Sequence, residues 1–156
     1  MILDKLKLVN KKVISTIDIK KNTPICEFQG AMYNEGVTPE SNDALQIYHN
    51  IYMGYSGKIY DHIRHSCSPN CFVSIIGKRA VLYSLYDIKK NMEITFDYST
   101  TSTESLDQWS MKCNCGSYNC RKIISGIQSL DTKTIEEYKK KNMIPLFITN
   151  KIFGKI

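Results

Sequence analysis

The chain has 156 residues, the length of one compact domain, and its shares of hydrophobic (42%) and charged (23%) residues are those of a folded globular protein, which excludes wholesale disorder. Its formal net charge of +6 favours an anionic partner if charge alone is considered. No apolar run approaches the roughly 18 residues of a membrane-spanning helix, and the N-terminus lacks the apolar core and cleavage site of a secretory signal, so the sequence predicts neither membrane insertion nor standard secretion.

In chain order, the hydrophobic pattern predicts many short strands. Residues 11–19 and 23–28 are β-branched and apolar at near-alternate positions, and a tight connection at Lys20–Asn22 would join them. Further runs rich in Ile, Val, Tyr and Phe are bounded by Gly, Asn or Lys-Lys turns and cover residues 51–56, 71–77, 79–88 and 92–98. The last two of these runs are predicted to be joined by a polar turn around Lys89–Asn91.

Helical signals are weaker than the strand signals. One or two helical turns are predicted within residues 42–51, and Thr132–Asn142 have the charged pattern of a surface helix that follows Asp131 as its cap. The apolar run 144–148 is predicted to pack back on the domain, with partner binding by this tail as the alternative. The predicted fold class is therefore mostly β, built of small curled sheets.

Acidic residues gather in two stretches that contain no Lys or Arg. The first lies between Lys21 and Lys58 and contains Glu27, Glu35, Glu40 and Asp43. The second runs from Asn91 to Met111 and contains Glu93, Asp97, Glu104 and Asp107. If the two stretches meet in space, they would form a surface that attracts a basic peptide, whereas solvated loops of chance composition are the alternative.

Three of the cysteines, Cys113, Cys115 and Cys120, lie close together in a turn-rich segment. Such spacing is poorly suited to disulfides among them but suits Zn²⁺, which takes three or four thiolates in a structural site. A fourth ligand must then come from a distant part of the chain, with Cys67 and Cys71 as the obvious donors and His65 next. A set of reduced thiols without metal is the alternative, and both interpretations imply a reducing compartment.

Three segments together carry a family resemblance: RHSCSPNC at 64–71, EITFDY at 93–98 and CNCGSYNC at 113–120. Their order and spacing resemble the SET domain family of protein lysine methyltransferases with its post-SET zinc motif, whose usual forms are N-H-S-C-x-P-N-C, E-[LI]-T-[FY]-D-Y and C-x-C-x4-C followed by Arg. CEFQG at 26–30 extends the similarity, which covers roughly residues 10–125.

The resemblance implies a SET-domain fold in which the first two segments interlock in a pseudoknot-like crossing, which is rare among proteins. It divides the chain into a SET domain (1–110), a post-SET zinc motif (111–126) and a C-terminal helical tail (127–156). It also makes Cys67 the fourth zinc ligand beside the C-terminal thiol trio. Cys71 is then expected to be a buried free thiol and Cys26 a core residue.

The activity that the resemblance implies is S-adenosylmethionine-dependent protein lysine N-methylation of a basic protein such as a histone. Tyr98 matches the catalytic tyrosine, and Phe96 matches the position that limits the number of methyl groups, where Phe leaves room beyond monomethylation. Phe28 matches a channel position that is more often Tyr. The alternative is a weakly active or inactive SET module that binds peptide or chromatin.

Cofactor contacts are expected from the same match. Asn10, Lys11 and Lys12 stand where the family has a glycine-containing turn, and Arg64 replaces the Asn that precedes His65. Arg64 has only donors and would repel the cofactor ammonium unless it swings away. Tyr98 and Trp109 complete the expected cofactor-binding set, although ordinary packing is the alternative for Trp109.

Other function classes fit the sequence less well. A zinc hydrolase needs an open metal position, whereas the expected site has four thiolates. Nucleic acid is expected to be contacted only indirectly, because few basic residues flank the zinc motif. The reduced thiols favour the nucleus or the cytosol, and the sequence leaves open the substrate, the oligomeric state and export into a host cell by a non-standard route.

Overall fold

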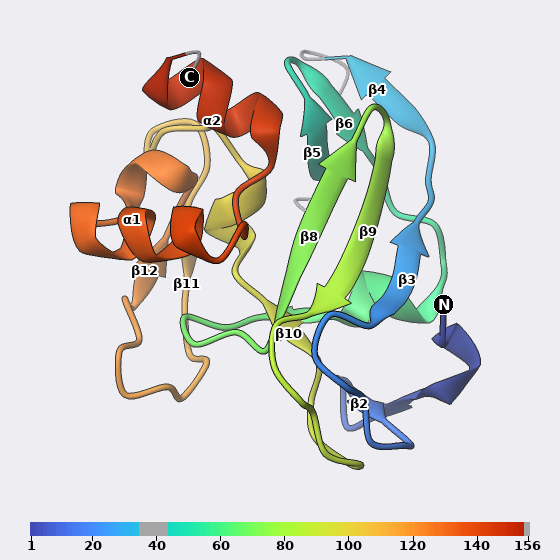
Figure 1. Ribbon diagram of the computed structural model, residues 1–156. Helices are drawn as coiled ribbons and strands as arrows, with labels where there is room; N and C mark the ends of the chain where they lie inside the picture. The colour runs from blue at the N-terminus through green and yellow to red at the C-terminus, as the bar shows by residue number, and fades with distance from the viewer. Residues whose placement is uncertain (35–43, 155–156) are drawn as a thin grey trace.

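The computed structural model describes residues 1–34 and 44–154, with most of the small β-sheets on one flank and the α-helices on the other (Figure 1). None of the helices in these ranges is long and apolar enough to cross a membrane. The helical elements are α1 (Thr132–Lys140), α2 (Leu146–Phe153) and the short 3-10 helices η1 (Leu3–Lys5), η2 (Ile59–His62), η3 (Tyr98–Thr101) and η4 (Ile127–Ser129).

Within the same ranges the strands form two three-stranded sheets and three two-stranded sheets. The first three-stranded sheet has the order β3-β9-β8 and contains β3 (Pro24–Phe28), β9 (Arg79–Ser84) and β8 (Cys71–Ile76). The second has the order β4-β6-β5 and contains β4 (Met32–Asn34), β6 (Ile51–Met53) and β5 (Leu45–Tyr48). The pairs are β1 (Leu6–Val9) with β2 (Lys12–Ser15), β7 (Arg64–His65) with β10 (Thr95–Phe96), and β11 (Met111–Lys112) with β12 (Ile123–Ile124).

The hairpin β8–β9 confirms the strands predicted at 71–77 and 79–88, although β9 ends at Ser84. Its register runs from Cys71 opposite Ser84 to Ile76 opposite Arg79, and alternate residues of β8 are buried, as the period of a strand requires. Gly77, at φ 62°, makes the turn between the strands. The strand that begins four residues after Cys67, β8, is therefore packed into the hydrophobic core through the sheet β3-β9-β8.

The strands predicted at 11–19 and 23–28 and the tight turn between them are confirmed, and each strand takes its partner from elsewhere in the chain. Both regions contain strands, but β2 pairs with β1 and β3 pairs with β9. The sequence gives little sign of β1, because Lys7 and Leu8 are both exposed and break the alternating pattern.

The polar turn predicted around Lys89–Asn91 is confirmed, and the difference from the prediction lies in the segments on either side of it. A turn is present, in which the Met92 N–H donates to the Lys89 carbonyl at 3.1 Å. Its flanks, however, bridge to an earlier segment, Ile88 to Ile19 and Glu93 to Ile14. Only residues 95–96 of the predicted strand at 92–98 are extended in a sheet, and they pair with β7.

The helical turns predicted within residues 42–51 are also wrong where the structure describes them. Residues 45–48 form β5, which pairs with β6, and Asn50 turns the chain between them at φ 55°. Gln46 and Ile47 are both buried in this paired segment, and such tertiary burial overrides the weak helical preference. Residues 42 and 43 lie outside the described residues.

The C-terminal segment contributes to the core instead of extending into solvent. Asp131 caps α1, because its carboxylate accepts the Thr134 N–H at 2.9 Å, which confirms the predicted helix and its cap. The apolar run 144–148 packs back on the domain as predicted, and its second half begins α2. Ile127, Tyr138 and Ile148 share one hydrophobic cluster with the sheet residues Val73 and Leu82.

Candidate functional site

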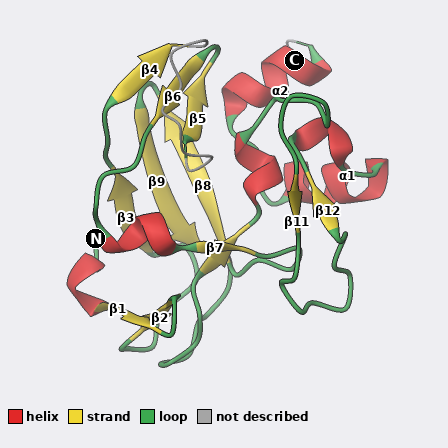
Figure 2. Ribbon diagram, turned by 180° about the vertical axis from the view of Figure 1, so that it is seen from behind, coloured by secondary structure: helices red, strands yellow, loops and turns green. Residues whose placement is uncertain are grey.

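Two of the motif segments lie side by side at the centre of the molecule, where β7 pairs in parallel with β10 (Figure 2). The register places Thr95 opposite Arg64 and Phe96 opposite His65. Asn70 strengthens this pairing, because its side-chain amide donates to the Glu93 carbonyl at 2.7 Å and accepts the Thr95 N–H at 3.0 Å. The contact on which the predicted pseudoknot depends is therefore present.

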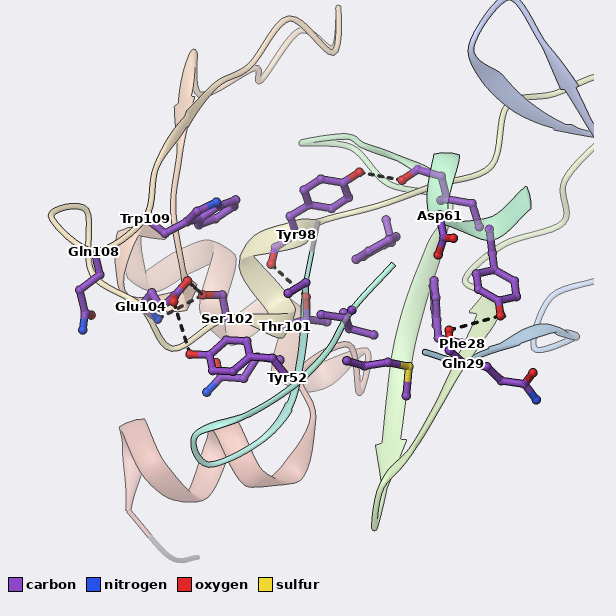
Figure 3. A pocket seen from close by; sticks show the side chains of 18 residues that line it. Phe28, Gln29, Tyr52, Asp61, Tyr98, Thr101, Ser102, Glu104, Gln108 and Trp109 are labelled. Carbon is purple, nitrogen blue, oxygen red and sulfur yellow. Dashed lines mark hydrogen bonds between the residues drawn. The ribbon is translucent and has the colours of Figure 1, made fainter. Parts of the chain in front are cut away.

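An aromatic pocket of about 250 Å³ opens beside this crossing (Figure 3). The predicted catalytic residues Phe28, Phe96 and Tyr98 all line it. Phe96 lies between the other two rings, with centroid distances of 6.1 Å to Phe28 and 4.9 Å to Tyr98. Tyr60, Tyr52 and Trp109 add further aromatic walls. The structure thus brings together three residues that lie as far as 70 positions apart in the sequence.

Tyr98 is held at two points. It is the first residue of η3, and its N–H donates to Nδ1 of the buried His65 at 3.2 Å. Burial lowers the pKa of His65 to about 4, so the ring is neutral near pH 7 and can accept this bond. The Tyr98 hydroxyl donates to the Ile63 carbonyl at 2.7 Å. Toward a ligand in the pocket, the hydroxyl oxygen can therefore act as an acceptor.

The pocket attracts cations. None of the described residues that line it is Lys or Arg, whereas Asp61 and Glu104 both contribute carboxylates. Asp61 is committed to the loop before η2, since its Oδ2 accepts the N–H groups of Ser56 and Lys58. Glu104 instead accepts long hydrogen bonds from the hydroxyls of Tyr52 and Ser102, each at 3.3 Å. Glu104 is therefore the carboxylate better placed to meet a positively charged ligand.

The predicted meeting of the two acidic stretches can be followed for only some of their residues. Glu35, Glu40 and Asp43 lie outside the described residues. Of the others, Glu27 pairs with Arg79 at 2.8 Å, and neither of these two residues lines the pocket.

The predicted metal ligands converge from two distant segments. Ligand atoms of His65, Cys67, Cys113 and Cys115 all lie within 4.8 Å of one another. Sγ of Cys113 lies 3.8 Å from Sγ of Cys67 and 3.6 Å from Sγ of Cys120. The structure therefore brings three of the four predicted thiols together with the ring of His65, whose Nε2 lies 3.2 Å from Sγ of Cys67, while Cys120 lies beside Cys113 and outside this group of four.

The thiol geometry fits Zn²⁺. Tetrahedral coordination with Zn–S bonds of about 2.3 Å separates the sulfur atoms by about 3.8 Å, close to the two distances seen around Cys113. All six cysteines are free thiols. Burial opposes ionisation of Cys115, but the Cys67 N–H and the Ser117 hydroxyl outweigh it and lower the pKa of Cys115 to about 6. At least one thiolate is thus available near neutral pH.

The two remaining cysteines are confirmed as core residues. Cys71 and Cys26 are 0% and 1% exposed, and burial raises the pKa of Cys26 to about 12 and also raises that of Cys71. Both are therefore neutral, inert thiols within the sheet β3-β9-β8.

The turn at Asn10–Lys11 has the backbone of a glycine turn without glycine. Both residues adopt positive φ, 49° and 62°, and they connect β1 to β2 as a two-residue hairpin loop. The absence of glycine from this part of the sequence therefore does not prevent the tight turn that a cofactor loop requires.

Arg64 swings to Glu93. Its Nε and terminal nitrogen donate to the two carboxylate oxygens at 2.7 and 3.1 Å, and Nζ of Lys12 lies 3.6 Å from the same carboxylate. The predicted repulsion between Arg64 and a cofactor ammonium is thus reduced by a bidentate partner. Glu93 was not among the predicted site residues, although it opens the EITFDY segment.

The other expected cofactor residues form a second group. Tyr98 and Trp109 pack against Cys67, Cys113 and Ile124, and His65 is itself one of the candidate metal ligands. The His65 ring contacts the Tyr98 ring at a centroid distance of 5.4 Å. The predicted cofactor set therefore separates into Lys12 and Arg64 around Glu93 and three aromatic residues beside the thiols.

One buried network was missed in the sequence. The carboxylate of Asp97, 1% exposed, accepts both terminal nitrogens of Arg121 at 2.8 Å, the Tyr138 hydroxyl at 2.9 Å and the Ser99 N–H at 3.0 Å. Arg121 follows the last cysteine of the zinc motif, which is a signal that could have been used. Tyr138 carries no such signal, because only the orientation of α1 places its hydroxyl at Asp97.

Comparison with protein families identifies the region that carries the first two motif segments. The SET domain family model matches residues 10–99. Among curated proteins, human histone-lysine N-methyltransferase 2D is 28% identical over 121 residues, which is 67% of this chain and 2% of that protein. Histone-lysine N-methyltransferase ASHH2 of Arabidopsis thaliana is 38% identical over 103 residues, 64% of this chain and 5% of that protein. The chain therefore spans only a small part of these relatives.

A relative from Candida albicans, named histone-lysine N-methyltransferase, H3 lysine-4 specific, is 41% identical over 69 residues, 42% of this chain and 6% of that protein. Among solved structures, KRYPTONITE in complex with mCHH DNA, H3(1-15) peptide and SAH has a TM-score of 0.60 and 25% identity, covering 77% of this chain and 29% of that one. SUVH6 of Arabidopsis thaliana in complex with SAM has a TM-score of 0.63 and 17% identity, covering 76% and 32%, and shows the likeness of fold alone.

Proposed function

Because the chain belongs to the SET domain family, we propose that it is an S-adenosylmethionine-dependent protein lysine N-methyltransferase. The observation that carries this proposal is the convergence of Phe28, Phe96 and Tyr98 on one aromatic pocket at the crossing of β7 and β10. The names of the relatives and the SAH in the KRYPTONITE complex support the same activity.

The pocket provides what methylation of a lysine requires, an uncharged amine held in a fixed direction. Aromatic walls disfavour the ammonium form and so lower the pKa of an entering lysine. With its proton donated to the Ile63 carbonyl, the Tyr98 hydroxyl offers its oxygen to an N–H of the amine. Such a bond would orient the nitrogen lone pair and keep the nucleophile within reacting distance.

Phe96 and Phe28 set how much room the amine has. Neither ring carries a hydroxyl that could hold a water molecule beside the nitrogen. We therefore propose that the protein can proceed beyond monomethylation. The Phe28 ring packs edge-on against Tyr60 at 5.4 Å, so its wall is rigid although it lacks the hydroxyl that is more common at this position.

S-adenosylmethionine, when bound, supplies an electrophilic methyl group on a sulfonium and departs as a neutral thioether. Asn10 and Lys11 would approach it with exposed backbone, and Lys12 would meet its carboxylate. Arg64, His65, Tyr98 and Trp109 complete the proposed set. The glycine-like turn and the Arg64–Glu93 pair are the features of this chain that fit such a ligand.

A structural Zn²⁺ is proposed for the thiols of Cys67, Cys113, Cys115 and Cys120. The ion would tie the segment before β8 to the loop between β11 and β12, beside Tyr98 and Trp109. The proposed boundaries are a SET domain at 1–110, the zinc motif at 111–126 and the tail at 127–156. The reduced thiols favour a nuclear or cytosolic location.

The proposed substrate is a basic protein, with a histone tail as the leading candidate. Glu104 and the absence of Lys and Arg from the described lining favour a positively charged peptide. The H3 peptide in the KRYPTONITE complex and the H3-specific name of the fungal relative support this class. A SET module that only binds peptide or chromatin is the second candidate.

The deciding experiment combines binding and turnover. Isothermal titration with S-adenosylmethionine is expected to give a binding isotherm. Mass spectrometry of histones incubated with the protein and S-adenosylmethionine is expected to show methyl-lysine. Tyr98→Phe should abolish turnover while it retains cofactor binding, and Tyr118→Phe, whose ring is 99% exposed, is the matched control. Peptide binding without turnover would favour the second candidate, and failure to bind the cofactor at high concentration would refute the enzyme.

A further inference from the structure

We propose that Tyr138 of the C-terminal helix α1 is a positioning residue for Tyr98 and for the metal cluster, acting through the buried Asp97–Arg121 pair. The inference rests on the proposed function, which assigns Tyr98 to catalysis, and extends it to a segment outside the family match at residues 10–99. Its basis is a continuous chain of contacts from α1 to Cys67.

The first step of this chain is the bond between α1 and the EITFDY segment. Tyr138 is buried, with 6% of its surface exposed, and its hydroxyl donates to Oδ2 of Asp97 at 2.9 Å. The same oxygen accepts NH1 of Arg121 at 2.8 Å. Removal of the hydroxyl would therefore leave a buried carboxylate with one donor fewer, since water has little access to Asp97.

The second step joins Asp97 to Tyr98. Oδ1 of Asp97 accepts the Ser99 N–H at 3.0 Å and thereby caps η3, whose first residue is Tyr98. The direction of the Asp97 carboxylate thus sets the start of the short helix that carries the proposed catalytic hydroxyl. Asp97 lies between the two pocket residues Phe96 and Tyr98, so a change in its side chain acts on both.

The third step joins Asp97 to the thiols. Among the described residues, Arg121 Nε has no hydrogen-bond partner, so the guanidinium is held by Asp97 and by the Ser99 hydroxyl at 3.2 Å. The backbone N–H of Arg121 donates to Sγ of Cys67 at 3.4 Å. Arg121 also follows Cys120 directly in the chain. The position of Arg121, and with it the spacing of the thiols, therefore depends on the Asp97 carboxylate that Tyr138 supports.

Tyr138→Phe tests the proposal, because it deletes the hydroxyl and leaves the ring in the core. Trp109 is the single tryptophan and packs against the metal cluster, whereas Tyr138 belongs to the main core, so Trp109 fluorescence reports on a site that Tyr138 reaches through Asp97 and Arg121. We expect acrylamide quenching of Trp109 in the folded protein to increase. We also expect kcat to fall by about ten- to hundredfold while KM for the peptide changes little.

Two variants serve as controls. Tyr86→Phe deletes another hydroxyl that contacts the end of α1, where it accepts Nζ of Lys141 at 2.8 Å on the solvent side, and should change neither readout. Ile148→Val removes one methyl group from the core that Tyr138 also belongs to. It should lower the stability of the protein without changing the hydrogen bonds of Asp97 and Arg121, and so serves as a control for loss of stability alone.

The outcomes separate the two proposals. If Tyr138→Phe lowers the midpoint of unfolding as Ile148→Val does but leaves both Trp109 quenching and kcat at wild-type values, the hydroxyl serves stability alone and the positioning role is refuted. If the wild-type protein transfers no methyl group, the proposed function fails and the catalytic half of this inference fails with it. Increased quenching in Tyr138→Phe would then still support its role in ordering the metal cluster.

Discussion

At the scale of single residues, the charge state and the polarity of a few side chains decide what the pocket accepts. Tyr98 and Glu104 supply polar groups to a wall that also carries several aromatic rings, and Phe96 separates Phe28 from Tyr98. Each of these side chains can be changed by a few atoms without changing the volume of the core, so their roles can be tested one at a time.

Phe96→Tyr should restrict the product to monomethyl-lysine. The added hydroxyl enters the space beside the proposed amine position, where it can hold water and exclude a methylated nitrogen. Mass spectrometry of the peptide at long reaction times is the measurement, and the first methyl transfer is expected to continue. Equal amounts of di- and trimethyl product in variant and wild type would contradict the role of Phe96.

Glu104→Gln should weaken the binding of basic peptides. The variant keeps the size of the side chain but removes the charge, so KM for a peptide rich in Lys and Arg is expected to rise by about three- to thirtyfold, the effect of roughly 0.6–2 kcal/mol at a half-buried site. Asp107→Asn, on the exposed part of the same loop, is the control. A rise of equal size in both variants would indicate a general effect of net charge.

At the scale of elements, side chains hold the motif segments together more than strand ladders do. The β7–β10 ladder has only two residue pairs, and Asn70 adds two hydrogen bonds across it. Gly126 lets the start of η4 lie close to the backbone of the pocket residue Glu104, because a Cβ at position 126 would lie 2.3 Å from the Glu104 carbonyl oxygen.

Asn70→Ala should destabilise the protein by about 2–4 kcal/mol. It leaves the Glu93 carbonyl and the Thr95 N–H without their partner at a partly buried crossing, and each unpaired group costs about 1–3 kcal/mol. Urea unfolding followed by circular dichroism is the measurement. Asn119→Ala, which removes a more peripheral amide that donates to the Cys67 carbonyl, is expected to cost less.

Gly126→Ala should shift the backbone of η4 away from the segment 102–104. The added methyl group meets backbone atoms of Ser102 and Glu104 that have no flexible end to yield, so a loss of stability above about 1 kcal/mol is expected. Peptide KM should rise with it, because Glu104 moves. An unchanged melting temperature would show that the loop adapts without strain.

At the scale of the whole molecule, one hydrophobic cluster joins the sheet β3-β9-β8 to α1 and α2, while the thiols and Trp109 form a second, smaller cluster. The main cluster predicts a single cooperative unfolding transition for sheets and tail. The smaller one depends on the proposed Zn²⁺ for most of its stability, because few apolar side chains contribute to it.

Removal of metal by a strong chelator should therefore lower the melting temperature and expose the loop 113–122 to proteases while it leaves most of the far-ultraviolet circular dichroism intact. Cys67→Ser should reproduce this behaviour, because it removes the one thiol that comes from the other segment. Cys26→Ser, in the main core, should instead destabilise without protease cleavage in that loop. Protection of the loop in chelator would contradict the structural role of zinc.

Features that depend on residues close together in the sequence could be predicted, whereas features that depend on distant residues could not. Tyr98, Phe96 and the thiol trio stand in compact motifs, so their convergence could be predicted from spacing and resemblance. The pairing of residues 92–98 could not, because the short β10 takes its partner from β7 and not from its neighbour in the chain. Long-range burial also decided β5, where helical turns were expected.

The side chains that connect motifs were harder to predict than the motifs themselves. Glu93 pairs with Arg64, which stands where the family has Asn, and Asn10 and Lys11 adopt the positive φ that a glycine turn would have. Both compensations become visible only in three dimensions. Tyr138 is similar, since a helical pattern identifies which face is buried but not which carboxylate that face meets.

The contact between Cys67 and Cys113 joins positions 46 residues apart, and this separation has a consequence for how the protein is made. A chain that emerges from the ribosome presents Cys67 well before the other thiols exist, so the proposed Zn²⁺ could reach full coordination only after Cys120 has been made. Refolding in the test tube should accordingly show a slow final phase whose rate rises with the concentration of free Zn²⁺.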